Sequence, residues 1–116
     1  MPDKHAFLSA SSSHRWINCP PSAALCAKKP NNSSPYAQQG TDVHSLCEHK
    51  VLTALGQASR DPTESLIWFD EEMEDCTDQY CTYVMEQLQE TKKLCPDPQV
   101  LVEQRLDFSR WVPDAF

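Results

Sequence analysis

Two ionisable side chains, His44 and Glu48, are spaced so that they could act together. They lie four residues apart in a segment whose apolar residues recur every three or four positions. This pattern predicts a helix from about Tyr36 to Leu55 with both side chains on one face. An imidazole and a carboxylate placed in this way could bind a divalent metal ion or polarise a water molecule. Such a pair is equally compatible with the solvated face of an amphipathic helix.

Glu103 lies in a second segment of interest. After Cys95-Pro96-Asp97-Pro98 the apolar residues alternate, which predicts a strand over residues 99–108 with Glu103, Arg105 and Asp107 on one face. Alternating charges of this kind can be the ion-paired solvent face of a strand. Because a lone strand leaves its backbone groups unpaired, it must pair with residues 1–10, with the 66–69 run or with another chain. The last case predicts either self-association through the 100–108 strand or the docking of a partner against it.

An acidic cluster opens the strongest predicted helix, which runs from Asp70 to about Leu94. It consists of Asp70, Glu71, Glu72, Glu74, Asp75 and Asp78. Acids at a helix start suit the macrodipole and can simply be solvated. They can also form a surface that binds a protein partner with a basic groove. The formal charge of −7 has the wrong sign for binding phosphates, so direct DNA binding by this chain alone is not expected.

The cysteines look like a disulfide set by number, but their sequence context favours a reducing compartment. No apolar segment follows Met1-Pro2-Asp3 as in a signal peptide, and no apolar run approaches membrane-spanning length. We therefore expect a cytoplasmic protein with reduced thiols and no membrane association. The six cysteines include no Cys-x-x-Cys pair, so no zinc spacing is recognised, and most are predicted to be small core residues.

The remaining elements complete a mainly helical fold. Ser11 to Ser13 should cap a helix that begins near His14, and a short helix should follow from Pro21 to Ala27. Gly56 is placed as a left-handed terminator, whereas the 66–69 run could be a strand or a turn. The sequence thus predicts a single domain over residues 1–116, mainly α with one or two short strands (α+β). Its helical region spans residues 11–95, and its strand spans 99–108.

Three blocks of sequence, in this order, resemble the front half of a phage-associated RecB-like nuclease of the PD-(D/E)XK superfamily. They are the serine-rich segment from Ser9 to Cys19-Pro20, the Gly40-Thr41-Asp42-Val43-His44 motif, and the segment around Glu103. The resemblance implies that His44 lies beside a catalytic metal and that Glu103 helps to position it. It also aligns Cys19 with a cysteine that some relatives use in an iron–sulfur cluster. Because the partner thiols for a cluster are not found, Cys19 is predicted to pack in the core.

The resembled enzymes complete their metal site with a glycine-flanked aspartate and an Asp-x-Lys strand. Neither motif occurs up to Phe116, so no catalysis and no cofactor are expected, and Mg²⁺ or Mn²⁺ would be required only by a full nuclease. The predicted function is a non-catalytic binding protein in the host cytosol. It would inhibit a host nucleic-acid-handling complex, as anti-CRISPR proteins do. The alternative is the N-terminal fragment of a metal-dependent phage DNA exonuclease.

Overall fold

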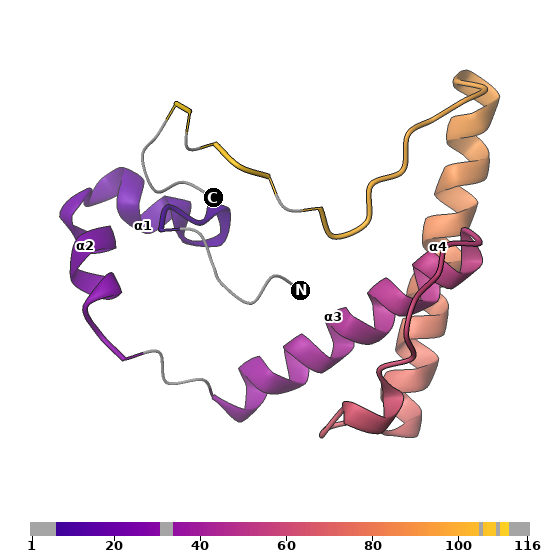
Figure 1. Ribbon diagram of the computed structural model, residues 1–116, viewed down its shortest axis with the longest axis horizontal. Helices are drawn as coiled ribbons and strands as arrows, with labels where there is room; N and C mark the ends of the chain where they lie inside the picture. The colour runs from indigo at the N-terminus through magenta and orange to yellow at the C-terminus, as the bar shows by residue number, and fades with distance from the viewer. Residues whose placement is uncertain (1–6, 31–33, 105, 109, 112–116) are drawn as a thin grey trace. The chain divides into compact units, whose positions relative to one another are not determined.

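The computed structural model describes residues 7–30, 34–104, 106–108 and 110–111. Every regular element within these residues is a helix (Figure 1). In chain order they are η1 (Ala10–Ser12), α1 (Ser13–Asn18), α2 (Pro21–Ala27), α3 (Pro35–Ala54), η2 (Thr63–Ser65) and α4 (Glu71–Leu94). The chain divides into two compact units, described separately below: the α3–α4 unit, essentially residues 33–103, and the α1–α2 unit, residues 2–32 with 104–116.

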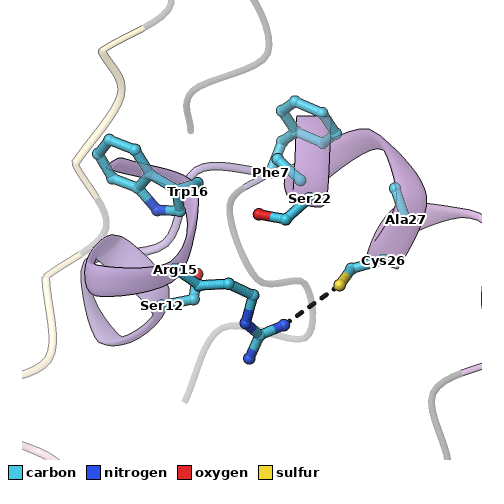
Figure 2. A pocket seen from close by; sticks show the side chains of 8 residues that line it. Phe7, Ser12, Arg15, Trp16, Ser22, Cys26 and Ala27 are labelled. Atoms are coloured by element: carbon cyan, nitrogen blue, oxygen red, sulfur yellow. Dashed lines mark hydrogen bonds between the residues drawn. The ribbon is translucent and has the colours of Figure 1, made fainter. Parts of the chain in front are cut away.

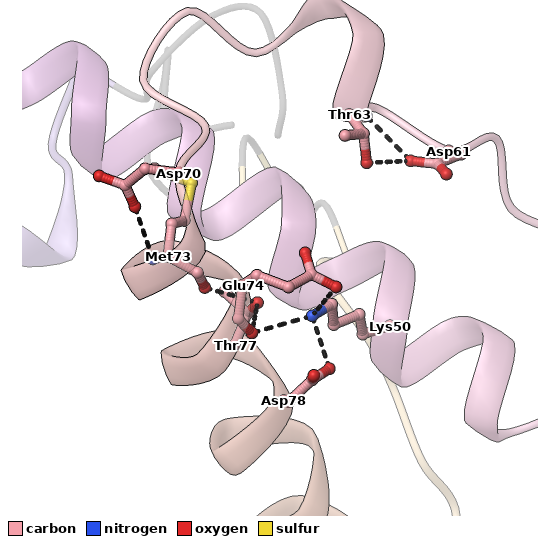
Figure 3. Close-up of polar contacts among 8 residues, drawn as sticks. All are labelled: Lys50, Asp61, Thr63, Asp70, Met73, Glu74, Thr77 and Asp78. Carbon is pink, nitrogen blue, oxygen red and sulfur yellow. Dashed lines mark hydrogen bonds and ion pairs between the residues drawn. The ribbon is translucent and has the colours of Figure 1, made fainter.

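Local capping explains the limits of the two long helices. The Ser34 hydroxyl accepts a hydrogen bond from the Ala37 amide at 3.2 Å, and Pro35 occupies the first turn of α3, where a missing N–H costs nothing. Gly56, with a φ of 75°, follows the last turn of α3 in the left-handed conformation. Asp70 caps α4 by accepting a hydrogen bond from the Met73 amide at 2.7 Å (Figure 3). The predicted helices are therefore confirmed to within about one residue at these ends.

The core of the α3–α4 unit lies between its two helices. Leu46, Val51 and Met73 are buried, and Thr77 is fully buried beside them. The Thr77 hydroxyl donates to the carbonyls of Met73 and Glu74 at 2.8 and 3.0 Å, so its burial leaves no polar group unpaired (Figure 3). A hydroxyl satisfied within its own helix can thus occupy a core position.

Lys50 of α3 holds α4 through three polar contacts. Its ammonium group lies 3.0 Å from Oε1 of Glu74 and 2.6 Å from Oδ1 of Asp78, and it donates to the Glu74 carbonyl at 3.1 Å (Figure 3). Burial alone would lower the pKa of Lys50, but the hydrogen bonds to Asp78 and Glu74 outweigh it, and the pKa is raised. The charged form of Lys50 is therefore favoured between the helices.

Asp42 of α3 organises the segment that leads into α4. Its buried carboxylate accepts hydrogen bonds from the amides of Ile67 and Trp68, at 2.9 and 3.0 Å through Oδ2. Oδ1 accepts a third bond from the Gln38 side chain at 3.1 Å. Residues 66–69 consequently form a bend rather than a strand, because two of their amides bind a side chain instead of a β-ladder.

The predicted α+β fold class is wrong, since the described residues contain no strand. Residues 95–104 and 106–108 are irregular, and Glu103 has a left-handed backbone with a φ of 46°, which interrupts the extended conformation. Arg105 lies outside the described residues. An alternating pattern shows that a strand could have one buried face, but it cannot supply the partner that a strand requires. Self-association through residues 100–108 is not tested by a single chain and stays a prediction.

The α1–α2 unit is built from short elements. The expected serine cap is absent at α1, where Ser12 makes no capping side-chain bond and instead its hydroxyl lies 2.7 Å from that of Ser9. The indole of Trp16 donates to the Ser9 carbonyl at 2.9 Å and so ties α1 to the turn before it. Pro21 begins α2, as predicted from the tolerance of a first helical turn for proline.

The helices that the structure describes include none with both the length and the apolar character needed to cross a bilayer.

Candidate functional site

A pocket of about 400 Å³ lies in the α3–α4 unit, beside both long helices. Its walls are formed by Val43, His44, Cys47, Glu48 and Val51 from α3, by Tyr80 and Val84 from α4, and by Val100, Leu101, Val102 and Glu103. The lining thus brings together His44, Glu48 and Glu103, three of the ionisable residues singled out in the sequence. Most of the other walls are apolar, as is usual for ligand sites.

His44 and Glu103 approach each other at this pocket. Nδ1 of the imidazole is 3.9 Å from Oε1 of the carboxylate, and the side chains are 64% and 37% exposed, so both remain accessible to a ligand. The left-handed backbone of Glu103 is unusual for a residue with a Cβ, and such conformations cluster at functional sites. The bend in the chain at Glu103 therefore accompanies the placement of its carboxylate beside His44.

These donors fit only part of a metal site. Among the described residues no group of three or more His, Cys, Asp or Glu side chains is arranged to hold a metal ion. An imidazole nitrogen and a carboxylate oxygen 3.9 Å apart could occupy two positions around one cation after a small adjustment. Mg²⁺ and Mn²⁺ sites often contain few protein ligands and are completed by water and substrate phosphates. The described residues thus contribute at most two positions.

Gly40 and Cys19 are less closely connected with this pocket. A Cβ at Gly40 would meet nothing within 4 Å, so the described fold gives no reason for glycine at that position. Cys19 is exposed at the end of α1, in the other unit. The prediction that Cys19 packs in the core is wrong, as it is for Cys26, Cys76 and Cys95, because the helices that carry them leave these faces uncovered.

Cys47 and Cys81 are the two partly buried cysteines. Burial raises the pKa of the Cys47 thiol, opposed by the charge of Lys50 and assisted by Cys81, so Cys47 stays protonated and a poor nucleophile at neutral pH. Catalysis by this thiol is not indicated.

The acidic cluster divides into members that make contacts within the fold and members that are exposed. Asp70 caps α4, while Glu74 and Asp78 pair with Lys50 (Figure 3). The remaining members, Glu71, Glu72 and Asp75, are exposed and form no ion pair with any described residue. Only these three remain available to a partner without disturbing the fold.

Asp42 and Lys50 were not singled out in the sequence, although both organise the elements around the pocket. A weak signal was present, because Asp42, Leu46 and Lys50 are spaced four apart and share the face of α3 that meets α4. Polar residues on such a face are normally assigned to solvent. Their partners, the amides of residues 67 and 68 and the carboxylates of Glu74 and Asp78 in α4, become visible only in the folded chain.

Residues 5–116 match the family described as "Protein of unknown function (DUF2800)", and the chain belongs to this family. The match extends over nearly all of the sequence, so both units fall within it. No solved structure matches the chain. Since the family description assigns no activity, a functional argument must start from the residues at the pocket.

Proposed function

We propose that this chain forms the front part of a metal-dependent, nucleic-acid-cleaving enzyme of the RecB-like type. The observation that supports the proposal is the pairing of His44 with Glu103 at 3.9 Å in one pocket. The two residues come from distant parts of the sequence and belong to separate blocks of the nuclease-like pattern. A purely inhibitory protein has no need to bring them together.

The chemistry requires that the pocket hold a hard cation close to a phosphodiester. A divalent ion would there polarise the phosphoryl oxygen and lower the pKa of a bound water. His44 and Glu103 would each offer one donor atom, and Glu48, one helical turn after His44, also lines the pocket. The apolar side chains of Val43, Val51 and Val84 would limit the access of bulk water and strengthen electrostatic contacts inside. The remaining ligands must come from substrate, water or other residues.

Binding of Mn²⁺ tests the proposed site directly. Electron paramagnetic resonance of Mn²⁺ titrated with the protein should show weak binding. In His44→Ala and Glu103→Gln, affinity should fall by about tenfold or more, at least the cost of losing an outer-shell partner. His14→Ala removes an exposed histidine of α1 outside the pocket and should leave binding unchanged. Equal Mn²⁺ binding by the wild-type protein and His44→Ala would refute the assignment.

On its own, this chain is expected to leave linear DNA intact in Mg²⁺ or Mn²⁺, because its described residues supply too few ligands for a complete site. Degradation of linear DNA that disappears in His44→Ala would show that further ligands are not needed. That result would mean that this chain contains a complete metal site and not the proposed partial one.

A second candidate function is the binding of a protein partner with a basic surface, as in anti-CRISPR-type inhibition of a host complex. It is favoured by Glu71, Glu72 and Asp75, which are exposed and unpaired within the described residues. Binding of this kind should weaken with salt, mainly through slower association. If charge reversal at these three positions together left affinity for the partner unchanged, they would be only a solvated helix end.

A further inference from the structure

A second pocket, of about 210 Å³, lies within the α1–α2 unit (Figure 2). Phe7 and Trp16 contribute aromatic rings to its lining, Arg15 a guanidinium group, and Ser22 a hydroxyl group. Figure 2 shows the Arg15 side chain extending between the two short helices and the Ser22 hydroxyl directed into the space between them. A cation, a hydroxyl donor and two aromatic rings therefore surround one small volume.

Two polar groups in this pocket lack adequate partners. The Ser22 hydroxyl oxygen is buried and makes no hydrogen bond in the described part of the chain. Buried hydroxyl groups nearly always have a partner, so an exception calls for an explanation. Arg15 donates through Nη1 to the sulfur of Cys26 at 3.2 Å, and sulfur is a weak acceptor. A guanidinium group has five N–H donors, and among the described residues no acidic side chain pairs with this one.

The charges of the sequence are segregated between the two units. Residues 2–32 and 104–116 contain six basic and three acidic side chains, whereas residues 33–103 contain four basic and fourteen acidic ones. The formal charge of −7 therefore hides a basic unit within an acidic protein. The objection that the whole chain has the wrong sign for phosphates does not apply to the α1–α2 unit.

We propose that this pocket binds the phosphate-bearing end of a nucleic-acid strand. The planar fork of Arg15 suits two phosphate oxygens, and the Ser22 hydroxyl can donate to a third. Trp16 and Phe7 offer aromatic faces on which the terminal base can stack, a contact that tolerates any base. Ligand pockets usually measure about 300–1,000 Å³, so a volume of about 210 Å³ suits the terminal phosphate group rather than a longer stretch of the strand.

The inference rests on the proposed function in one respect, namely that the substrate is a nucleic acid. It assigns that substrate a contact outside the His44–Glu103 pocket, through residues that belong to the other unit. Binding of a strand end requires no metal ion. It can therefore be measured in EDTA, where metal binding at His44 and Glu103 cannot contribute.

Fluorescence anisotropy of short labelled single strands with the full chain in EDTA tests the proposal. Strands with a 5′-phosphate, with a 3′-phosphate and with hydroxyl groups at both ends should differ in affinity. One of the two phosphorylated strands should bind most tightly. Arg15→Gln should weaken that binding by about tenfold to a hundredfold, the loss expected for a charge-assisted contact. Ser22→Ala should weaken it by about twofold to tenfold, while thermal stability stays unchanged or rises because an unpaired buried hydroxyl is removed.

Lys28→Gln is the matched control, since it removes the same charge from the same unit but does not line the pocket. His44→Ala should bind strand ends like the wild-type protein, so loss of Mn²⁺ binding and loss of strand-end binding are separable. Circular dichroism verifies that Arg15→Gln is folded. Equal affinity for phosphorylated and unphosphorylated ends, or equal weakening by Arg15→Gln and Lys28→Gln, would overturn the proposal, because either result indicates diffuse electrostatic attraction.

Discussion

At the scale of single residues, Asp42 joins two segments of the fold through one short side chain. Asp42 is 4% exposed, and its carboxylate accepts three hydrogen bonds, two of them from consecutive amides of the bend at residues 66–69. A buried charge is tolerated only when its lone pairs are occupied in this way. Asp42 therefore joins α3 to the segment that leads into α4, and it does so two residues before His44.

Replacement of Asp42 by alanine should lower the free energy of unfolding by about 2–4 kcal/mol. The amides of residues 67 and 68 would lose their acceptor, and the removed carboxylate would leave a cavity. Urea denaturation followed by circular dichroism measures the change. Asp75→Ala, at an exposed position of α4, should change stability by less than about 0.5 kcal/mol. A loss below about 1 kcal/mol for Asp42→Ala would mean that the bend finds other acceptors.

At the scale of the helices, Lys50 is the polar link between α3 and α4. Its side chain is only 14% exposed, whereas those of Glu74 and Asp78 are 43% and 62% exposed, so solvent weakens the ion pairs without abolishing them. Lys50→Met keeps an unbranched apolar side chain and should cost about 1–2 kcal/mol. Lys93→Met, which removes an exposed pair with Glu90 within α4, should cost less than about 0.5 kcal/mol. Equal losses in the two variants would contradict the role of Lys50.

The pH dependence of this link has a definite sign. The pKa of Lys50 in the folded protein is raised above its ordinary value of 10.5, so its contribution is fully present below pH 10.5. It should decline as the pH rises through the folded-state pKa. The stability difference between the wild-type protein and Lys50→Met should therefore stay constant from pH 7 to 10 and shrink at higher pH. A difference that already shrank between pH 7 and 9 would exclude this account.

The helices show what periodicity can predict and what it cannot. The bounds of α3 and α4 follow from Ser34, Gly56 and Asp70, whose capping chemistry is local and therefore readable in the sequence. The buried positions of α4 do not follow from side-chain polarity, because Tyr80 is 50% exposed while Thr77 is completely buried. Whether a hydroxyl can be buried depends on partners that polarity alone does not reveal.

The strand and the site depended on contacts between distant segments. Residues 99–108 have the alternation of a strand, but the described residues among them are irregular, and Glu103 turns the chain into a left-handed conformation. The motif residues His44 and Glu103 could be proposed individually. Their approach to 3.9 Å, and the pocket they share, required the folded α3–α4 unit.

At the scale of the whole molecule, the two compact units differ in charge and in the kind of pocket they contain. The acidic α3–α4 unit contains the buried residues and the His44–Glu103 pair, and the more basic α1–α2 unit contains the pocket at Arg15. Among the described residues, all those that are buried belong to residues 33–103. The α3–α4 unit thus has its own core.

A polypeptide of residues 33–103 alone should therefore fold cooperatively and retain the helices α3 and α4. Circular dichroism during thermal unfolding measures both properties. Lys50→Met in this polypeptide should lower the midpoint, which shows that the native helix pair is present. A gradual, non-cooperative loss of helicity would mean that the α3–α4 unit needs the rest of the chain.

The position of Asp42 inside the Gly40-to-His44 motif has a consequence for the history of the family. Selection on the motif acts for two reasons, because the aspartate maintains the fold and the histidine faces the pocket. If the proposed metal site operates in this family, a lineage that lost it but kept a folded protein would be free to change His44, yet it would have to retain Asp42. Under that proposal, relatives with the aspartate and without the histidine should fold in the same way but bind Mn²⁺ more weakly.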